Sequence, residues 1–235
     1  MRFRPTFWAT ALALPVLIVL IGLGTWQVQR LQWKNELIAT RAERVGALPV
    51  EITEALAAAG DLADVEYRPV TVSGELRNDR AMILLNRVHN GQVGGHLIAP
   101  MELANGLGTV MVDRGWMSLP DLRAFAAAGG ESVTLDGFVR MYTAPGGFVP
   151  ENEPATNNWF FMHEGEMLAA AGLSGPVGFY VQAGPKATPP GVYPMGAVPD
   201  VNLRNSHLEY AVTWYALAAV FLVIFFIFHW NRKDT

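Results

Sequence analysis

The stretch that decides the fold is residues 7–26, FWATALALPVLIVLIGLGTW, which is apolar throughout and carries no charge. A second stretch of the same kind, residues 211–230, reads AVTWYALAAVFLVIFFIFHW near the other end of the chain. Each has about the 20 residues that an α-helix needs to cross roughly 30 Å of hydrocarbon. The sequence therefore predicts a protein that spans a membrane twice and holds one large domain on one side of it.

The first apolar stretch could instead be a cleaved signal peptide. Arg2 and Arg4 would form its basic n-region, but the run is longer than the roughly 7–15 apolar residues of a signal peptide. A small-x-small cleavage site does not follow it, since the chain continues as TWQVQR over residues 25–30. We therefore expect a retained anchor. The lack of an Arg- and Ser-rich transit peptide favours the inner membrane of a bacterium.

Positive charge predicts the orientation of the two spans. The tails hold Arg2, Arg4, Arg232 and Lys233 against Asp234, whereas the stretch between the spans has more acidic than basic residues. Long domains are translocated largely regardless of their own charge, so we expect both termini in the cytoplasm and the domain in the periplasm. The expected segments are a cytoplasmic tail 1–6, a first span 7–26, a periplasmic domain 27–206, a second span 207–230 and a cytoplasmic tail 231–235.

Composition excludes several classes of function. The chain contains no cysteine, which excludes disulfides and thiol-based metal or redox chemistry. Its net charge is −4 without a basic block, so we do not expect it to bind nucleic acid. The motifs G-x-S-x-G, G-x-x-x-x-G-K and H-E-x-x-H do not occur, and we expect no enzymatic activity.

The polar stretch between the spans predicts an α+β domain. The first helix should continue outward, because Trp26, Arg30, Trp33 and Leu37 recur on one helical face. Short helices are expected over residues 51–59, 120–128 and 164–171. Alternating segments predict strands over residues 67–74, 81–88, 96–103, 109–116, 133–142, 158–163 and 178–183. Since long helical crossovers do not separate these strands, we expect a mainly antiparallel sheet or an open barrel.

The two spans are expected to pack against each other as an antiparallel pair. Small side chains let helices approach closely in a membrane, so we expect contacts through Gly22 and Gly24 on the first span. Their expected counterparts on the second span are Ala211, Ala218 or Ala219.

Four fragments of the sequence resemble signatures of one known family. They are GTWQVQRLQWK at 24–34, YRPVTVSG at 67–74, VDRGW at 112–116 and NSHLEYAVTW at 205–214. In this order, and with two spans, they make the chain similar to the Surfeit-locus-one family of cytochrome c oxidase assembly proteins. One departure is Asp113, where the family usually has Asn. This acid could pair with the neighbouring Arg114.

The resemblance implies a function that the residues alone do not reveal. Members of the family help to build haem–copper oxidases, and some bacterial members are thought to bind haem a and pass it to the oxidase core subunit. The implied partners are that core subunit, the enzyme that synthesises haem a, and membrane lipid. A cofactor-free assembly scaffold or sensor, which binds a partner through its periplasmic domain, stays open as the alternative.

His207 is the candidate ligand for haem iron. It precedes the second apolar stretch and shares a helical face with Tyr210, Ala211, Trp214 and Ala218. Haem iron takes an imidazole nitrogen and a porphyrin takes flat apolar contact, so His207, Tyr210 and Trp214 would supply both. The alternative is an interfacial histidine beside ordinary belt aromatics.

Other basic side chains also have a ligand-binding and an ordinary interpretation. Arg30 follows the first span closely and could pair with a haem propionate, since guanidinium groups match carboxylates. Contact with a lipid headgroup or a salt bridge is the alternative. His229 is expected to anchor the far end of the second span at the cytoplasmic interface. His89 and His96 flank a glycine-rich hairpin loop, where solvation is favoured over metal binding.

Overall fold

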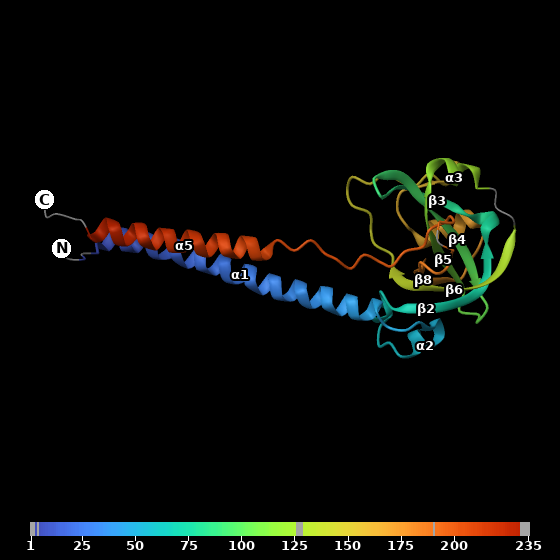
Figure 1. The fold of residues 1–235 in the computed structure, drawn as a ribbon, viewed down its shortest axis with the longest axis horizontal. Helices are drawn as coiled ribbons and strands as arrows, with labels where there is room; N and C mark the ends of the chain where they lie inside the picture. The colour runs from blue at the N-terminus through green and yellow to red at the C-terminus, as the bar shows by residue number, and fades with distance from the viewer. Residues whose placement is uncertain (1–2, 4, 126–128, 190, 231–235) are drawn as a thin grey trace. The chain divides into compact units, whose positions relative to one another are not determined.

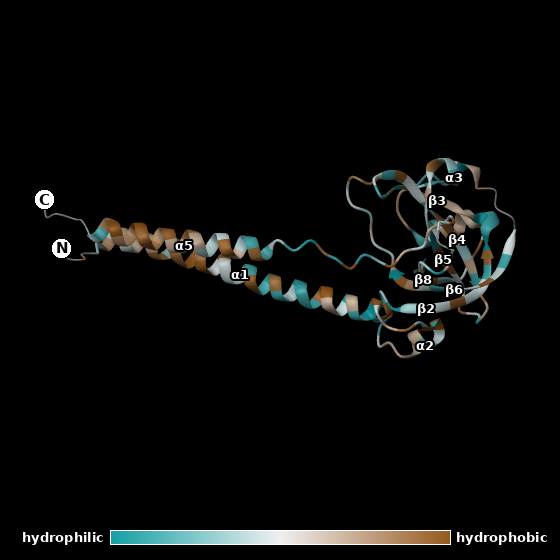
Figure 2. Cartoon of the chain, viewed as in Figure 1, coloured by the Kyte–Doolittle hydropathy of each residue, from teal (hydrophilic) through white to brown (hydrophobic). Residues whose placement is uncertain are grey.

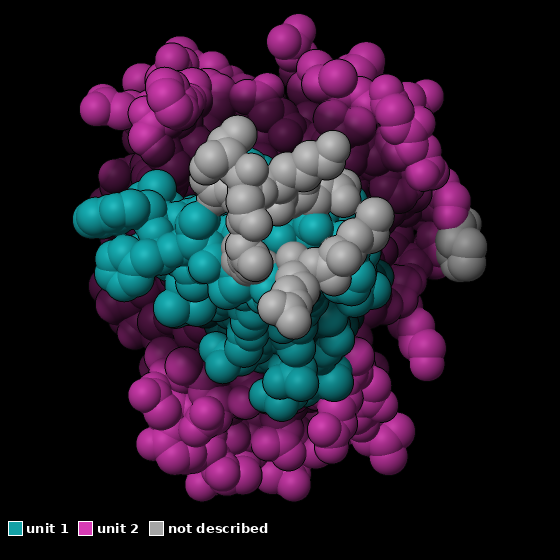
Figure 3. Space-filling model, turned by 90° about the vertical axis from the view of Figure 1, so that its left-hand side faces the viewer, with its two compact units in different colours: residues 1–41, 201–235 teal, residues 42–200 magenta. Residues whose placement is uncertain are grey.

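The chain divides into two compact units in the computed structural model, which describes residues 3, 5–125, 129–189 and 191–230 (Figure 1). Residues 1–41 and 201–235 make the first unit, and residues 42–200 make the second (Figure 3). Two apolar terminal helices and a mainly sheet domain with short helices confirm the predicted α+β fold class. The basic tail residues that predict the orientation of the spans lie outside the described residues.

Two long helices form the first unit. Helix α1 runs from Phe7 to Val45, and helix α5 runs from His207 to Trp230. Both contain segments long and apolar enough to cross a membrane, and most side chains there are exposed, as expected of surfaces that face lipid (Figure 2). Helix α1 does continue beyond its apolar stretch, as the spacing of its tryptophans predicted. Which of its residues lie within the bilayer stays a prediction.

The two helices pack antiparallel through small residues. His207, at the start of α5, bonds to Gln27, whereas His229, near its end, bonds to Thr6. Gly24 is buried, and a Cβ built on it would come within 2.8 Å of the Tyr215 ring. Helix α1 therefore needs a glycine where this tyrosine crosses it.

The predicted helix contacts are correct at three positions and wrong at two. Gly24 on α1 and Ala211 and Ala218 on α5 are buried. Gly22 and Ala219 are exposed instead, and nothing lies within 4 Å of a Cβ built on Gly22. At about 100° per residue, Gly22 is turned roughly 200° from Gly24 and Ala219 roughly 100° from Ala218, so neither faces the partner helix.

The second unit is built around a closed barrel of five strands. They are β2 (Pro69–Arg77), β4 (Gln92–Leu103), β5 (Thr109–Ser118), β6 (Gly130–Met141) and β8 (Pro176–Ala183). Around the ring β2 pairs with β4, β4 with β5, β5 with β8, β8 with β6, and β6 with β2. The β5–β8 pair is parallel and the other four are antiparallel, which is the Greek-key order of the OB-fold barrel.

The alternation of side chains along the strands builds the barrel core. Val70 and Val72 on β2 and Val110 and Val112 on β5 are all fully buried in one cluster, since residues two apart point to the same face. The ring closes where β2 pairs with β4 and β6 together. A Cβ at Gly74, in the middle of β2, would overlap the backbone carbonyl of a β4 residue. Glycine therefore lets the strands approach closely enough for closure.

Short elements complete the second unit. Strands β1 (Val50–Glu51) and β7 (Asn158–Trp159) pair parallel with β2 and β3, and β3 (Met82–His89) pairs antiparallel with β4. The helices are α2 (Ile52–Ala57), α3 (Leu119–Ala124) and α4 (Glu164–Ala171), with 3₁₀ turns at Leu62–Val65, Asn78–Arg80 and Pro154–Thr156. Helix α4 has the predicted bounds, and Gly172 ends it at φ 68°. The predicted end of α3, residues 126–128, lies outside the described residues.

One predicted strand is shorter than its sequence pattern. The alternation predicted a strand over residues 158–163, but only Asn158 and Trp159 pair with β3. The Asn152 side-chain oxygen accepts the backbone N–H groups of Phe160 and Phe161 at 2.9 and 3.3 Å. These donors are therefore bonded to a side chain and do not extend the sheet.

Candidate functional site

The first turn of α5 is tied to α1 by several polar contacts. The Lys34 ammonium donates to the carbonyl of Arg204, just before α5 begins. The Asn205 side chain donates to Asn35 at 2.9 Å, and its oxygen lies 3.4 Å from the backbone N–H of His207. These bonds hold the histidine at a defined place beside α1.

The imidazole of His207 has one occupied and one available nitrogen. Its Nδ1 lies 2.7 Å from the side-chain oxygen of Gln27. An amide oxygen can only accept a hydrogen bond, so Nδ1 carries the proton and donates it. Nε2 has no partner among the residues that the structure describes, and the side chain is half-buried. The lone pair on Nε2 is therefore available to a ligand.

Two aromatic side chains lie below His207 on α5, as the helical spacing predicted. Tyr210 is 56% exposed, and Trp214, one turn further along, is partly exposed. Neither ring has a stacking partner among the described aromatic contacts. They present an open apolar surface beside the imidazole, of the kind that a flat macrocycle covers.

Arg30 is occupied by two tryptophans of its own helix. Its guanidinium carbon lies 5.9 Å from the ring centre of Trp26 and 5.2 Å from that of Trp33. The structure does not bring Arg30 into hydrogen-bond contact with α5 in the part of the chain described. Lys34, which the sequence reasoning did not consider for the site, is an α1 cation that donates to the carbonyl of Arg204, three residues before His207.

This set of residues fits a haem held through one histidine. The unpartnered Nε2 of His207 would supply the iron ligand, and Tyr210 and Trp214 would supply flat contact. Arg30 and Lys34 would supply positive charge on the neighbouring helix for propionates. A metal ion held by protein side chains alone is not supported, because the described residues contain no cluster of three or more His, Asp or Glu.

His229 contrasts with His207 because both of its ring nitrogens are occupied. The side chain is fully buried. Nδ1 lies 2.8 Å from the Phe225 carbonyl and Nε2 lies 3.2 Å from the Thr6 hydroxyl. The expected interface anchor is therefore a buried link between the two helices.

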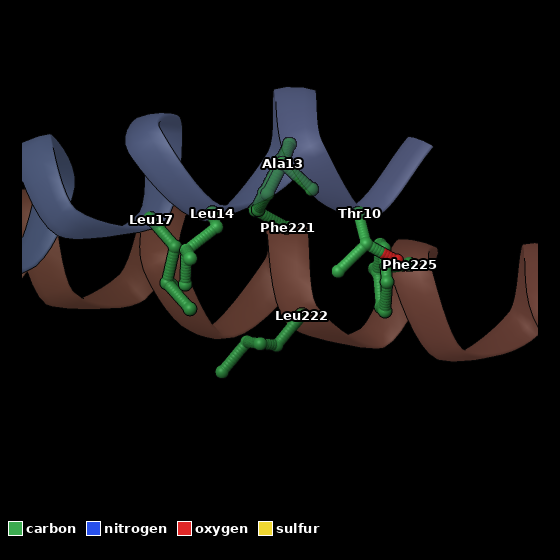
Figure 4. Close-up of a pocket in the computed structure, with 7 residues that line it drawn as sticks. All are labelled: Thr10, Ala13, Leu14, Leu17, Phe221, Leu222 and Phe225. Carbon is green, nitrogen blue, oxygen red and sulfur yellow. The ribbon is translucent and has the colours of Figure 1, made fainter. Parts of the chain in front are cut away.

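An apolar hollow lies between α1 and α5 (Figure 4). It is lined by Thr10, Ala13, Leu14, Leu17, Phe221, Leu222 and Phe225. The one hydroxyl in this lining, on Thr10, donates to the Thr6 carbonyl at 2.9 Å. The hollow therefore offers apolar contact and no ligand for a metal.

Asp113 does not pair with Arg114, contrary to the sequence expectation. Its carboxylate lies 2.8 Å from His96 Nδ1 and also accepts the backbone N–H of Gly115. Arg114 donates to Asn78 at 2.7 Å, and burial lowers the pKa of its guanidinium. Arg114 lies at an irregularity of β5, since Asp113 pairs with Ile98 and Gly115 with Leu97, and the two neighbouring side chains bond to different partners.

His89 and His96 line one small depression with Trp116. The His89 ring lies 5.3 Å from the Trp116 ring, and the tryptophan N–H donates to the Arg87 carbonyl. Asp113 lines the same depression, but the described residues include no group of three or more such side chains placed to hold a metal ion. The structure gives no support for a metal site in this hairpin.

The fold and the site define a membrane-anchored barrel protein with one available histidine at the mouth of its helix pair. The model of the SURF1 family matches residues 14–219. Similar proteins include a SURF1-like protein of Monosiga brevicollis, 32% identical over 231 residues (93% of this chain and 85% of the relative). Surfeit locus protein 1 is 34% identical in Homo sapiens (89% of this chain and 73% of the relative) and 33% in Mus musculus (87% and 70%).

The chain therefore belongs to the SURF1 family, as its four motifs indicated. Members of this family are cytochrome oxidase assembly factors rather than catalysts.

Proposed function

We propose that this chain is a membrane-anchored assembly factor for haem–copper cytochrome c oxidase that binds haem a and assists its insertion into the core subunit. Membership of the SURF1 family supports the assembly role. The observation that carries the haem role is the half-buried His207, whose Nδ1 is bonded to Gln27 while Nε2 has no partner in the described chain.

Each residue of the site has a separate task in this proposal. His207 Nε2 ligates the iron, and Tyr210 and Trp214 cover one side of the macrocycle. The propionates, which must reach water, meet Arg30 or Lys34 where α1 leaves the apolar zone. Haem a is cargo here, and its redox chemistry is used after delivery. A single protein ligand suits a carrier, because release then requires one bond to break.

The proposal includes the cellular arrangement. Both termini face the cytoplasm and the barrel lies in the periplasm of a bacterial inner membrane. The partners are the oxidase core subunit and the enzyme that synthesises haem a. Reporter fusions after Gly146 and after Thr235 test the orientation, and cytoplasmic reporter activity at Gly146 would overturn it.

The visible spectrum of the detergent-purified protein tests the haem role. Wild-type protein from cells that make haem a should carry a Soret band, and His207→Ala should lose most of it while accumulating normally. His89→Ala, which removes a histidine from the β3–β4 hairpin, is the matched control and should keep the band. A colourless wild type would contradict haem binding. A His207→Ala protein with an unchanged spectrum would move the ligand elsewhere.

A cofactor-free scaffold is the second candidate, and one exposed loop favours it. Phe148 and Val149, in the loop that follows β6, are exposed on the surface of the second unit. Phenylalanine is one of the aromatic residues enriched in protein–protein interfaces. Under this alternative, Phe148→Ser should lower oxidase assembly, and no haem should purify with the chain.

A further inference from the structure

We propose that Gln27 is a positioning residue of the haem site, which keeps the proton of His207 on Nδ1 and thereby leaves Nε2 free for iron. The role toward iron rests on the proposed function above. The position of the proton is a property of the haem-free protein and can be tested without any haem.

The geometry places an acceptor where the histidine needs one. Gln27 is 8% exposed, although its side chain is polar and lies at the end of an apolar helix segment. Its oxygen is 2.7 Å from His207 Nδ1, across 180 residues of sequence. A buried amide is retained at such a position when its hydrogen bond is made.

Contacts made by α1 residues before and after Gln27 hold this part of the helix against α5. One turn before it, Gly24 lets the Tyr215 ring cross α1 closely, and the Tyr215 hydroxyl lies 3.1 Å from that of Thr25. Two turns after it, Lys34 donates to the carbonyl of Arg204. Gly24, Gln27 and Lys34 share one face of α1, so the helix register itself delivers the amide oxygen to the imidazole.

The hydrogen bond between Gln27 and His207 decides which nitrogen of the imidazole is left to bind a metal. A neutral imidazole carries one proton, and the hydrogen bond made by one nitrogen decides which nitrogen is left to bind a metal. Without a partner at Nδ1, the proton is found mainly on Nε2, the nitrogen that faces away from Gln27. Partners of this kind orient metal-bound histidines, and their loss typically lowers metal affinity roughly 10- to 100-fold.

An amide differs from a carboxylate in the same place. A carboxylate would draw the imidazole proton toward itself and make Nε2 a stronger ligand. Gln27 fixes the proton without adding charge at the membrane edge. The arrangement therefore suits a haem that must be bound and then given up.

A purely structural role for Gln27 makes a different prediction. If the amide only joined the two helices, Gln27→Leu would lower the stability of the pair and leave the protonation of His207 as it was. The two roles are separated by reading the histidine nitrogens directly.

¹⁵N NMR of the haem-free protein, labelled with ¹⁵N-histidine, shows which ring nitrogen of each histidine carries the proton. His207 in the wild type should show a protonated Nδ1 and an unprotonated Nε2, and Gln27→Leu should move the proton to Nε2. His229 is an internal control, since it donates to the Phe225 carbonyl and should not change. Gln32→Leu, an exposed glutamine of the same helix, should leave both histidines unchanged. A wild-type His207 protonated on Nε2, or a His207 unaffected by Gln27→Leu, would overturn the inference.

Haem titration then tests the consequence for iron. Gln27→Leu should bind haem roughly 10- to 100-fold more weakly. Gln27→Glu, which keeps an oxygen acceptor and guards against a leucine variant that fails to accumulate, should release haem more slowly and lower its midpoint potential. Unchanged affinity and spectrum in both variants would overturn the role toward iron. A wild type that binds no haem contradicts the proposed function instead, and the NMR result then decides the protonation of His207 alone.

Discussion

The two ends of the α1–α5 pair are each joined by a histidine of α5, but the two histidines are bonded differently. His229 is fully buried and uses both ring nitrogens, one on the Phe225 carbonyl and one on Thr6. His207 is half-buried and uses only Nδ1, on Gln27. Of these two histidines, only His207 therefore keeps a ring nitrogen that can bind a ligand, although both lie at a span end.

Replacing each histidine should separate ligand binding from stability, with the largest effect of all at His207. His207→Ala should remove most of the bound haem with little effect on thermal stability. His229→Ala should keep the Soret band and lower the stability of the helix pair by about 1–3 kcal/mol, because the Thr6 hydroxyl and the Phe225 carbonyl lose a buried partner. Spectra and thermal unfolding in the same detergent measure both. Equal loss of haem in the two variants would contradict the claim that His207, and not His229, binds haem.

Substitutions at two glycines of α1 should show how much the stability of the α1–α5 pair depends on close packing. Gly24→Leu should destabilise it by about 1–3 kcal/mol, since the new side chain meets the Tyr215 ring. Gly22→Leu is the matched control and should be nearly silent, because nothing lies within 4 Å of a Cβ there. Thermal unfolding measures both, and similar losses would mean that α1 faces α5 differently.

His96, a histidine of the second unit, provides a further test of where haem binds. Its Nδ1 bonds to Asp113 much as that of His207 bonds to Gln27, but it lies in the barrel and not at a membrane edge. His96→Ala should therefore leave the haem spectrum unchanged. It should also lower the unfolding free energy of the second unit by about 1–3 kcal/mol, because the Asp113 carboxylate loses its imidazole partner. A changed Soret band would place haem at the barrel instead.

Acid should have a smaller effect, confined to the second unit. Hydrogen bonds from Arg77 hold the pKa of Asp79 below its usual range, and Asn158 and Thr156 do the same for Glu153. Their stabilising contribution is complete above the unfolded-state pKa of about 4 and is lost as the pH falls through the folded-state values. At pH values below about 4, the denaturant concentration at the unfolding midpoint of the wild type should decrease slightly. The decrease should be smaller in Arg77→Ala. An equal fall in Arg77→Ala would exclude Asp79 as a cause.

Sequence predicted the parts of this molecule that depend on local pattern. The 3.6-residue period and the glycine after Ala171 marked α4, and the apolar run with His207, Tyr210 and Trp214 on one face marked the helix that carries the site. Closure of the barrel was not predicted, because the parallel β5–β8 pair joins strands that are separated in the chain by two strands (β6 and β7) and two helices (α3 and α4).

The partner of His207 was also missed, for the same physical reason. Gln27 contacts it across 180 residues, and local periodicity carries no information about such a pair. A signal was present: Gln27 is a polar residue on the Gly24 face of α1, directly after the apolar stretch, where a buried amide requires a partner. The prediction for Asp113 was wrong in the opposite way: adjacency in sequence suggested a pair with Arg114, whereas Asp113 bonds to His96 and Arg114 bonds to Asn78.

Chemical rescue by free imidazole tests whether His207 is the iron ligand. His207→Gly should lack the Soret band of the wild type, and imidazole added to the haem-loaded membranes should restore it, because the free base can occupy the space of the missing ring beside Gln27. Gln27→Leu combined with His207→Gly should respond only at higher imidazole concentration. Restoration by imidazole is the result predicted here. A His207→Gly protein that shows the wild-type band without imidazole would contradict the assignment of His207 as the ligand.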